Sequence, residues 1–158
     1  MLALIKLNFQ KIRHIGHAFV IKLKVNESKE SLKNLLKSIK TIAIIGASSN
    51  PERDSYKVMK FLIEKGYEVF PVNPNEFNNK ILDVDCYSNI QEIKKKIDMV
   101  DIFRAQEFVM EITQDAIAIG VEVIWTQEGI FDEKSADLAI NAGIIFVMNE
   151  CPKKILEN

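Results

Sequence analysis

The chain has 158 residues, of which 47% are hydrophobic and 27% charged, and its net charge is −1. This length supports one domain with a sizeable core, and the near-zero charge gives no indication of nucleic-acid binding. No apolar run is long enough for a membrane span, and two cysteines are too few for a disulfide scaffold. We therefore expect a soluble protein in a reducing cytoplasm.

Residues 1–26 differ from the rest because they carry five basic residues and no acidic one. Their apolar residues follow no clear period. Three interpretations stay open: an amphipathic extension, a targeting segment, or translation upstream of the natural start. We predict a poorly ordered or dispensable extension, followed by one domain over residues 27–158.

From Ser28 onward the pattern becomes regular. Leucine and isoleucine spacing predicts a helix over residues 28–40, capped by Ser28 or Ser31. A wholly apolar strand follows at 42–46, and such runs are typical of parallel strands buried on both faces.

Strand and helix patterns then alternate to the end of the chain. Further strands are predicted at residues 67–72, 83–87, 98–103, 121–126 and 144–149, and helices at 54–66, 109–120 and 133–143, with a capping box at 88–91 before a short helix. This alternation predicts a single doubly wound parallel α/β sheet flanked by helices. Ligands bind such sheets beyond the carboxyl ends of the strands.

The loop after the first strand reads "GASSNPERDS". Gly46 allows a ligand to approach the backbone closely. Arg53 supplies a positive charge, and Asp54 or Ser55 is expected to cap a helix whose N-terminus attracts anions. The alternative is an ordinary turn with a surface arginine. Ala47, Ser48 and Ser49 offer backbone N–H groups, and the two serines also offer hydroxyls. The candidate phosphate contacts in this loop are Gly46, Ala47, Ser48, Arg53 and Ser55.

Asn73-Pro74 follows the second strand, where a nicotinamide dinucleotide fold usually has an acid that holds the ribose. The missing acid, and the missing second and third glycines after Gly46, count against NAD. Asn73 can hydrogen-bond a ribose or a base, although the pair is also an ordinary turn starter. Phe103 and Arg104 are either a stacking ring and a phosphate contact, or a core phenylalanine and a solvated arginine.

The segment "WTQEG" ends the next strand. Trp125 is the only tryptophan, and core packing is its default role. Gln127 and Gly129 indicate a turn that a ligand can approach. Asp98 and Asp101 are three positions apart on a strand and face opposite sides, so we interpret them as structural rather than as a catalytic pair.

Cys86 is predicted to be a small apolar filler. Cys151 lies near the ligand end of the sheet, where it is either an inert buried thiol or a redox thiol. His14 and His17, the only histidines, lie in the extension. The predicted domain therefore has no histidine for general-base or metal chemistry.

Taken together, five segments resemble the stand-alone CoA-binding proteins, small relatives of the CoA-binding domain in the α subunit of succinyl-CoA synthetase. The segments are "IIGASSNPERDSYKV", "GYEVFPVNP", "DIFR", "IWTQEG" and "ECPK", within residues 30–154. The resemblance implies a Rossmann-like domain that holds coenzyme A by its ADP portion. It implies phosphate contacts from Gly46, Ser48, Arg53 and Ser55, adenosine contacts from Asn73 and Pro74, and a cleft lined by Phe103, Arg104, Trp125, Gln127 and Gly129. Glu128 departs from the family, which often has an apolar residue there.

The sequence thus favours a binding module for CoA or an acyl-CoA that catalyses no reaction itself. The alternative is a nucleotide-dependent enzyme, either an NAD-type oxidoreductase or an accessory subunit of a CoA ligase. A mixed disulfide between Cys151 and CoA is a third hypothesis. The acyl group and the formation of a homo-oligomer stay open.

Overall fold

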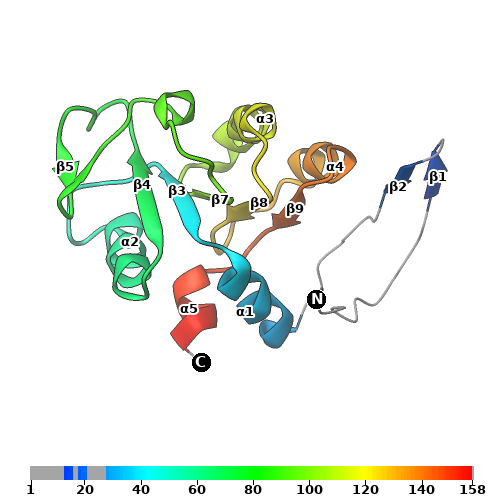
Figure 1. Cartoon of the computed structure of the whole chain (residues 1–158), viewed down its shortest axis with the longest axis horizontal. Coiled ribbons are helices and arrows are strands. Elements are labelled where there is room, and N and C mark those ends of the chain that lie inside the picture. Colours follow the sequence, from blue (N-terminus) through cyan, green and yellow to red (C-terminus); the bar gives the residue numbers. More distant parts are fainter. Residues whose placement is uncertain (1–12, 16–17, 21–27, 158) are drawn as a thin grey trace.

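A computed structural model describes residues 13–15, 18–20 and 28–157 of the chain. Its centre is a five-stranded parallel sheet in the order β4-β3-β7-β8-β9 (Figure 1). The strands are β3 (Thr41–Ile45), β4 (Glu68–Val72), β7 (Met99–Ile102), β8 (Val123–Thr126) and β9 (Ile145–Val147). The predicted doubly wound α/β fold is confirmed.

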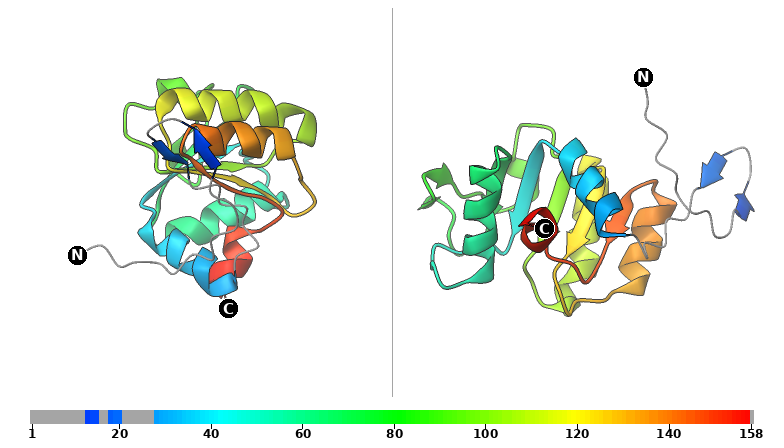
Figure 2. Two further views of the ribbon diagram at one scale, coloured as in Figure 1. Left: turned by 90° about the vertical axis from the view of Figure 1, so that its right-hand side faces the viewer. Right: turned by 90° about the horizontal axis from the view of Figure 1, so that it is seen from below.

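Helices cover both faces of this sheet, as Figure 2 shows in its left view. One face carries α1 (Lys29–Ser38), α2 (Asp54–Glu64) and α5 (Pro152–Glu157), and the other carries the 3₁₀ turn η1 (Ile90–Glu92), α3 (Val109–Ile119) and α4 (Glu133–Asn141), with the 3₁₀ turn η2 (Gln106–Phe108) leading into α3. Two apolar cores result, one on each side of the sheet.

Alternation along β3 explains why its sequence is wholly apolar. Ile42 and Ile44 pack in the core beneath α1, α2 and α5, whereas Ala43 between them packs in the core beneath α3 and α4. All three are completely buried. A strand sandwiched between two helical layers has no polar face, which is why continuous apolar runs predict parallel sheets.

The strand order creates a switch point between β3 and β7. The chain leaves β3 for β4 on one side, then returns to place β7 on the other side of β3. Connections on the two sides diverge there, and sheets of this kind bind ligands at the carboxyl edge of the switch point. The loops after β3, β4 and β7 all meet at this point.

The predicted third strand, at residues 83–87, is not a strand of the main sheet. Leu82 and Asp83 both have positive φ, 51° and 64°, and they turn the chain into a hairpin of β5 (Lys80–Ile81) and β6 (Val84–Asp85). Tyr87 forms only an isolated parallel bridge with Val72. Residues 83–87 therefore contribute to this hairpin instead of adding a sixth strand beside β4.

Several helix ends follow the sequence signals. Ser28 caps α1, where its side chain accepts from the backbone N–H of Ser31, and Gly120 ends α3 in the left-handed region. The capping box at 88–91 is wrong in detail, because Glu92 rather than residue 91 accepts from the backbone and hydroxyl of Ser88. Helix α5 is not among the predicted elements.

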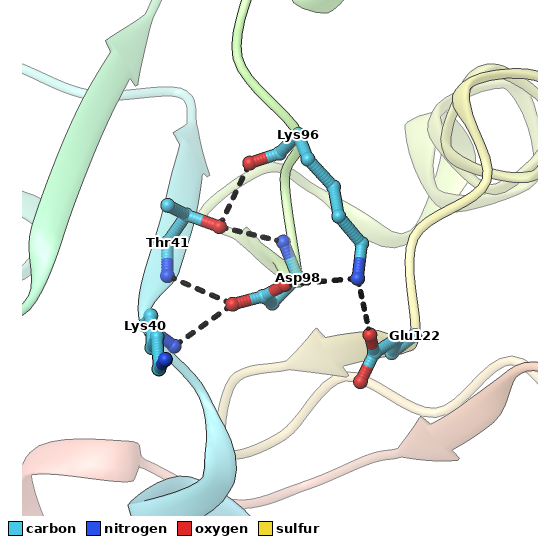
Figure 3. A network of polar contacts seen from close by, with 5 residues as sticks. All are labelled: Lys40, Thr41, Lys96, Asp98 and Glu122. Carbon is cyan, nitrogen blue, oxygen red and sulfur yellow. Dashed lines mark hydrogen bonds and ion pairs between the residues drawn. The ribbon is translucent and has the colours of Figure 1, made fainter.

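At the amino edge, Asp98 joins β3 to β7 (Figure 3). Its carboxylate accepts from the backbone N–H groups of Lys40, at 2.9 Å, and Thr41, at 3.1 Å. Its own N–H donates to the Thr41 hydroxyl, and it forms an ion pair with Lys96. Lys96 also pairs with Glu122. These contacts confirm the structural interpretation of Asp98.

A second small sheet pairs β1 (Arg13–Ile15) with β2 (Ala18–Val20) in antiparallel register. These six residues are the described part of the predicted extension 1–26. For the other residues of this extension, the prediction of poor order lies outside the described part of the chain.

Candidate functional site

The carboxyl edge brings together five loops that the sequence singled out. They begin directly after Ile45, Val72, Ile102, Thr126 and Val147, the last residues of the five sheet strands. Every predicted site residue except Trp125 and Ser55 lies in one of these loops, and those two lie in β8 and in the first turn of α2. The topology therefore places all of them at one edge of the sheet.

Gly46 lies directly against the loop that follows β7. It has φ +86°, and a Cβ atom at this position would lie 2.4 Å from the backbone oxygen of Phe103 and 3.0 Å from Cδ of Arg104. Its N–H donates to the backbone oxygen of Val72 at 2.9 Å. Only glycine fits this conformation and this approach without strain, so the loops after β3, β4 and β7 converge on one small residue.

The turn after Gly46 uses its own polar groups to fix its shape. The Ser48 hydroxyl accepts from the N–H of Asn50 at 3.1 Å. Ser49 donates both its N–H and its hydroxyl to Oε1 of Glu76, each at 3.0 Å. Glu76 comes from the loop after β4, and sequence reasoning missed it because no local pattern connects it to Ser49.

The N-terminus of α2 points its first amides toward this turn. Arg53 is the N-cap residue and makes no side-chain capping hydrogen bond, so among the described residues no side chain satisfies the amides of the first turn. The prediction that Asp54 or Ser55 caps this helix is wrong. Asp54 is the first helical residue, and the Ser55 side chain is buried. An uncapped helix N-terminus beside an exposed arginine is suited to an anion.

Asn73, directly after β4, holds the loop after β3 in place through its side chain. Its side-chain amide donates to the backbone oxygen of Ala47 at 2.8 Å, and its Oδ1 accepts from the N–H of Asn75 at 2.9 Å. Both ends of the Asn73 side chain thus bind protein backbone, while Pro74 is exposed. Ala47 itself is buried.

Phe103 and Arg104 take different environments after β7. Phe103 is half-buried against the core beneath α1, α2 and α5. The Arg104 guanidinium lies 4.1 Å from the centre of the Phe108 ring, a cation–π contact that orients the charge. Arg53 and Arg104 therefore supply positive charge from two different loops of the same edge.

Trp125 lies in the core rather than on the surface. It is completely buried, and its indole N–H donates to the backbone oxygen of Glu150 at 2.8 Å. Gly129 donates its N–H to Oδ1 of Asn149 at 2.8 Å, and Glu128 forms an ion pair with Lys154 of α5. These bonds join the loop after β8 to the chain after β9.

Asp101, which we interpreted as structural, lies one residue from the end of β7, within this site. Its carboxyl is completely buried and accepts from the side-chain amide of Gln127. Burial raises the pKa of Asp101 to about 8, and the Gln127 hydrogen bond offsets only part of that effect. The sequence signal that could have identified Asp101 as a site residue is an acidic residue within an otherwise apolar strand.

Both cysteines are free and buried. Burial raises the pKa of the Cys151 thiol, although the backbone N–H groups of Lys153 and Lys154 oppose this, and the negative charge of Asp101 raises it further. Burial also raises the pKa of the Cys86 thiol. A raised pKa keeps a thiol protonated and weakly nucleophilic.

Other site classes find no support in the described part of the chain. There, no group of three or more His, Cys, Asp or Glu side chains could hold a metal ion. The described helices are all too short or too polar to cross a membrane.

Sequence comparison places these features in a family. The family described as "CoA binding domain" matches residues 40–157. The uncharacterized protein YneT of Bacillus subtilis (strain 168) is 33% identical over 128 residues, which are 81% of this chain and 93% of YneT.

Two further relatives come from Pyrococcus. A hypothetical protein from Pyrococcus horikoshii OT3 superposes with a TM-score of 0.78 at 35% identity, over 90% of this chain and 97% of that one. The α subunit of ADP-forming acetate–CoA ligase I from Pyrococcus furiosus is 36% identical over 91 residues, which are 54% of this chain and 19% of the subunit. The chain thus spans about a fifth of that ligase subunit. With its Rossmann-like sheet and a family match over most of its length, this chain belongs to the CoA-binding domain family.

Proposed function

We propose that the protein binds coenzyme A or an acyl-CoA at the carboxyl edge of its sheet and catalyses no reaction of its own. The observation that carries the proposal is the uncapped N-terminus of α2 at the switch point, flanked by Arg53 and Arg104, in a chain of the CoA-binding family. Backbone amides and arginines bind phosphates through hydrogen bonds and charge, and such binding needs no catalytic group.

In this proposal the two arginines meet the separated phosphates of CoA. Arg53 and the first amides of α2, including that of Ser55, hold one phosphate group, and Ser48 of the preceding turn contributes its N–H and hydroxyl. The N–H groups of Gly46 and Ala47 donate to the backbone oxygen of Val72, so these two residues contribute by shaping the turn. Because the Ser55 side chain is buried, its contribution is the backbone N–H.

The remaining candidate residues shape the cleft. Asn73 and Pro74 border the adenosine, with Asn73 acting mainly by holding the first loop in place. Phe103 and Arg104 line one wall, and Gln127 and Gly129 close the other. The buried Trp125 supports that wall from beneath, because its indole fixes the chain at Glu150.

Two free cysteines remain consistent with the expected reducing cytoplasm.

A role as an accessory subunit of a CoA ligase is the second candidate. The similarity to the α subunit of an acetate–CoA ligase favours it over an NAD-type oxidoreductase. The described residues contain no carboxylate directly after β4, where a ribose acid would stand, since Asn73 occupies that position.

Isothermal titration with CoA, ATP and NAD tests the proposal directly. We expect CoA to bind tightest and 3′-dephospho-CoA more weakly than CoA, because one arginine would lose its phosphate. Tightest binding of NAD would overturn the proposal in favour of the oxidoreductase. Native mass spectrometry of the purified protein, searching for a retained ligand of CoA mass, provides an independent check.

A further inference from the structure

Asp101 is a carboxyl in an unusual place for a charged group. It lies in β7 between Ile44 of β3 and Trp125 of β8, with which it is in register. Its side chain is completely buried, Oδ1 accepts from Gln127, and Oδ2 has no hydrogen-bond partner among the described residues. An ionised carboxylate buried with a single neutral partner is costly, so this environment favours the uncharged acid.

Among the described residues, no positive charge contributes to the pKa of Asp101. The segment after β9 contributes the Cys151 thiol, on which the charge of Asp101 acts. The loop after β8 contributes Glu128, whose charge Lys154 of α5 balances in an ion pair. From α2, Asp54 acts on the same Lys154. The flanking positions in β3 and β8 are uncharged, so the neighbouring elements do not favour ionisation.

Asp101 is also close to the phosphate-binding loops of the proposed function. It precedes Phe103 by two residues, about 7 Å along a strand, and the Phe103 backbone oxygen faces Gly46. Its hydrogen-bond partner Gln127 belongs to the candidate cleft itself. A charge at this depth is screened less than one in water, so an anion at the carboxyl edge interacts with it.

We propose that ionisation of Asp101 controls ligand affinity at the carboxyl edge, so that the protein binds the anionic ligand with Asp101 uncharged and releases it more readily once Asp101 is charged. This inference rests on the proposed function. Linkage is reciprocal, and a bound CoA therefore raises the pKa of Asp101 further. Near pH 8, binding is then accompanied by proton uptake.

The test uses the methyl thioether of CoA, which has no thiol to titrate, and isothermal titration of the full chain. If binding raises the pKa of Asp101 by one unit, affinity falls about tenfold between about pH 7 and pH 10. The Asp101→Asn variant keeps an oxygen that can accept from Gln127 and carries no charge. We expect its affinity to stay flat over this range, and its binding to take up no protons when buffers of different ionisation enthalpy are compared at pH 8.

The Cys151→Ser variant is the matched control, because the thiol is the other neighbouring group that could titrate here. It must keep the wild-type pH dependence. A pH dependence that persists in Asp101→Asn, or vanishes in Cys151→Ser, overturns the inference. Absence of binding at every pH instead contradicts the proposed function, so the two failures are distinguishable.

A direct titration covers the case in which Asp101→Asn does not fold. The carboxyl ¹³C resonance of Asp101 can be followed in the wild-type protein with and without the thioether ligand. A midpoint that moves upward on binding supports the inference, and an unchanged or lowered midpoint overturns it.

Discussion

Ser49 gives both of its hydrogen-bond donors to a single oxygen of Glu76, at 3.0 Å each. The two residues come from different loops of the carboxyl edge, after β3 and after β4. A backbone N–H and a neighbouring hydroxyl are donors that a phosphate oxygen also accepts. Glu76 therefore places its own negative charge at the turn that we propose to receive the phosphates of CoA.

Replacing Glu76 with glutamine should tighten CoA binding. Glutamine keeps an oxygen for Ser49 but removes a charge that repels the ligand, and we expect affinity to rise by about threefold to tenfold, the scale of one partly screened charge. Isothermal titration at low salt measures the change. The control is Glu111→Gln, which should have no effect. Glu111 is an exposed acid on α3, which covers the face of the sheet opposite α2. Weaker binding by Glu76→Gln would contradict this role.

Arg53→Ala should weaken CoA binding by about tenfold, because it removes a charge-assisted contact to phosphate. The loss should shrink at high salt, where the charge is screened. Lys57→Ala is the control, since Lys57 lies one turn later in α2 and pairs with Glu52. Undiminished affinity in Arg53→Ala would remove the main support for the phosphate site.

Gly46→Ala should be markedly more destabilising than Gly66→Ala. Both glycines have positive φ, +86° and +91°, but a Cβ at Gly46 would meet the Phe103 backbone oxygen, whereas nothing lies within 4 Å of one at Gly66. Backbone strain alone costs about 1–3 kcal/mol in either variant. The clash in Gly46→Ala should therefore lower its free energy of unfolding further than that of Gly66→Ala. Urea unfolding of both variants measures it, and equal losses would show that the loops do not press on Gly46.

Asp98→Asn should lower the free energy of unfolding without changing CoA affinity. The variant weakens bonds to the Lys40 and Thr41 amides at the amino edge, and we expect a loss of about 1–3 kcal/mol. Burial tends to raise the pKa of Asp98, but these bonds and Lys96 lower it overall. Its contribution is therefore present above the unfolded pKa and is lost as pH falls through the folded pKa. Unfolding curves at acidic and neutral pH would reveal it, and an affinity change would place Asp98 in the site.

Asp101 should make stability depend on pH in the opposite direction. Its pKa is about 8 in the folded chain, above the value of about 4 for an unfolded aspartate. The folded state therefore holds its proton more tightly, and stability falls as pH rises from about 4 to about 8. Thermal unfolding should show this fall in the wild type and a smaller one in Asp101→Asn. Parallel curves would mean that Asp101 ionises normally.

Local patterns in the sequence predicted the five strands of the main sheet and helices α1 to α4, but not α5. Continuous apolar runs such as Ile42–Ile45 identify strands buried on both faces, and short-range signals such as Ser28 and Gly120 fix helix ends. The same reasoning failed at residues 83–87, where two positive φ values produce a hairpin. It also failed at the start of α2, because a polar residue near a helix start need not be the one that caps it.

The sequence by itself determined which loops share the carboxyl edge, since every parallel strand ends there, and the five segments that resemble CoA-binding proteins all lie in or beside those loops. Tertiary structure alone decided the contacts between them: Glu76 with Ser49, Gln127 with Asp101, and Trp125 with Glu150. Each of these pairs is separated by about 25 residues or more, and whether such groups meet depends on strand order and packing. Burial follows from the same packing, which is why an aspartate that looks structural in the sequence becomes a buried acid at the candidate site.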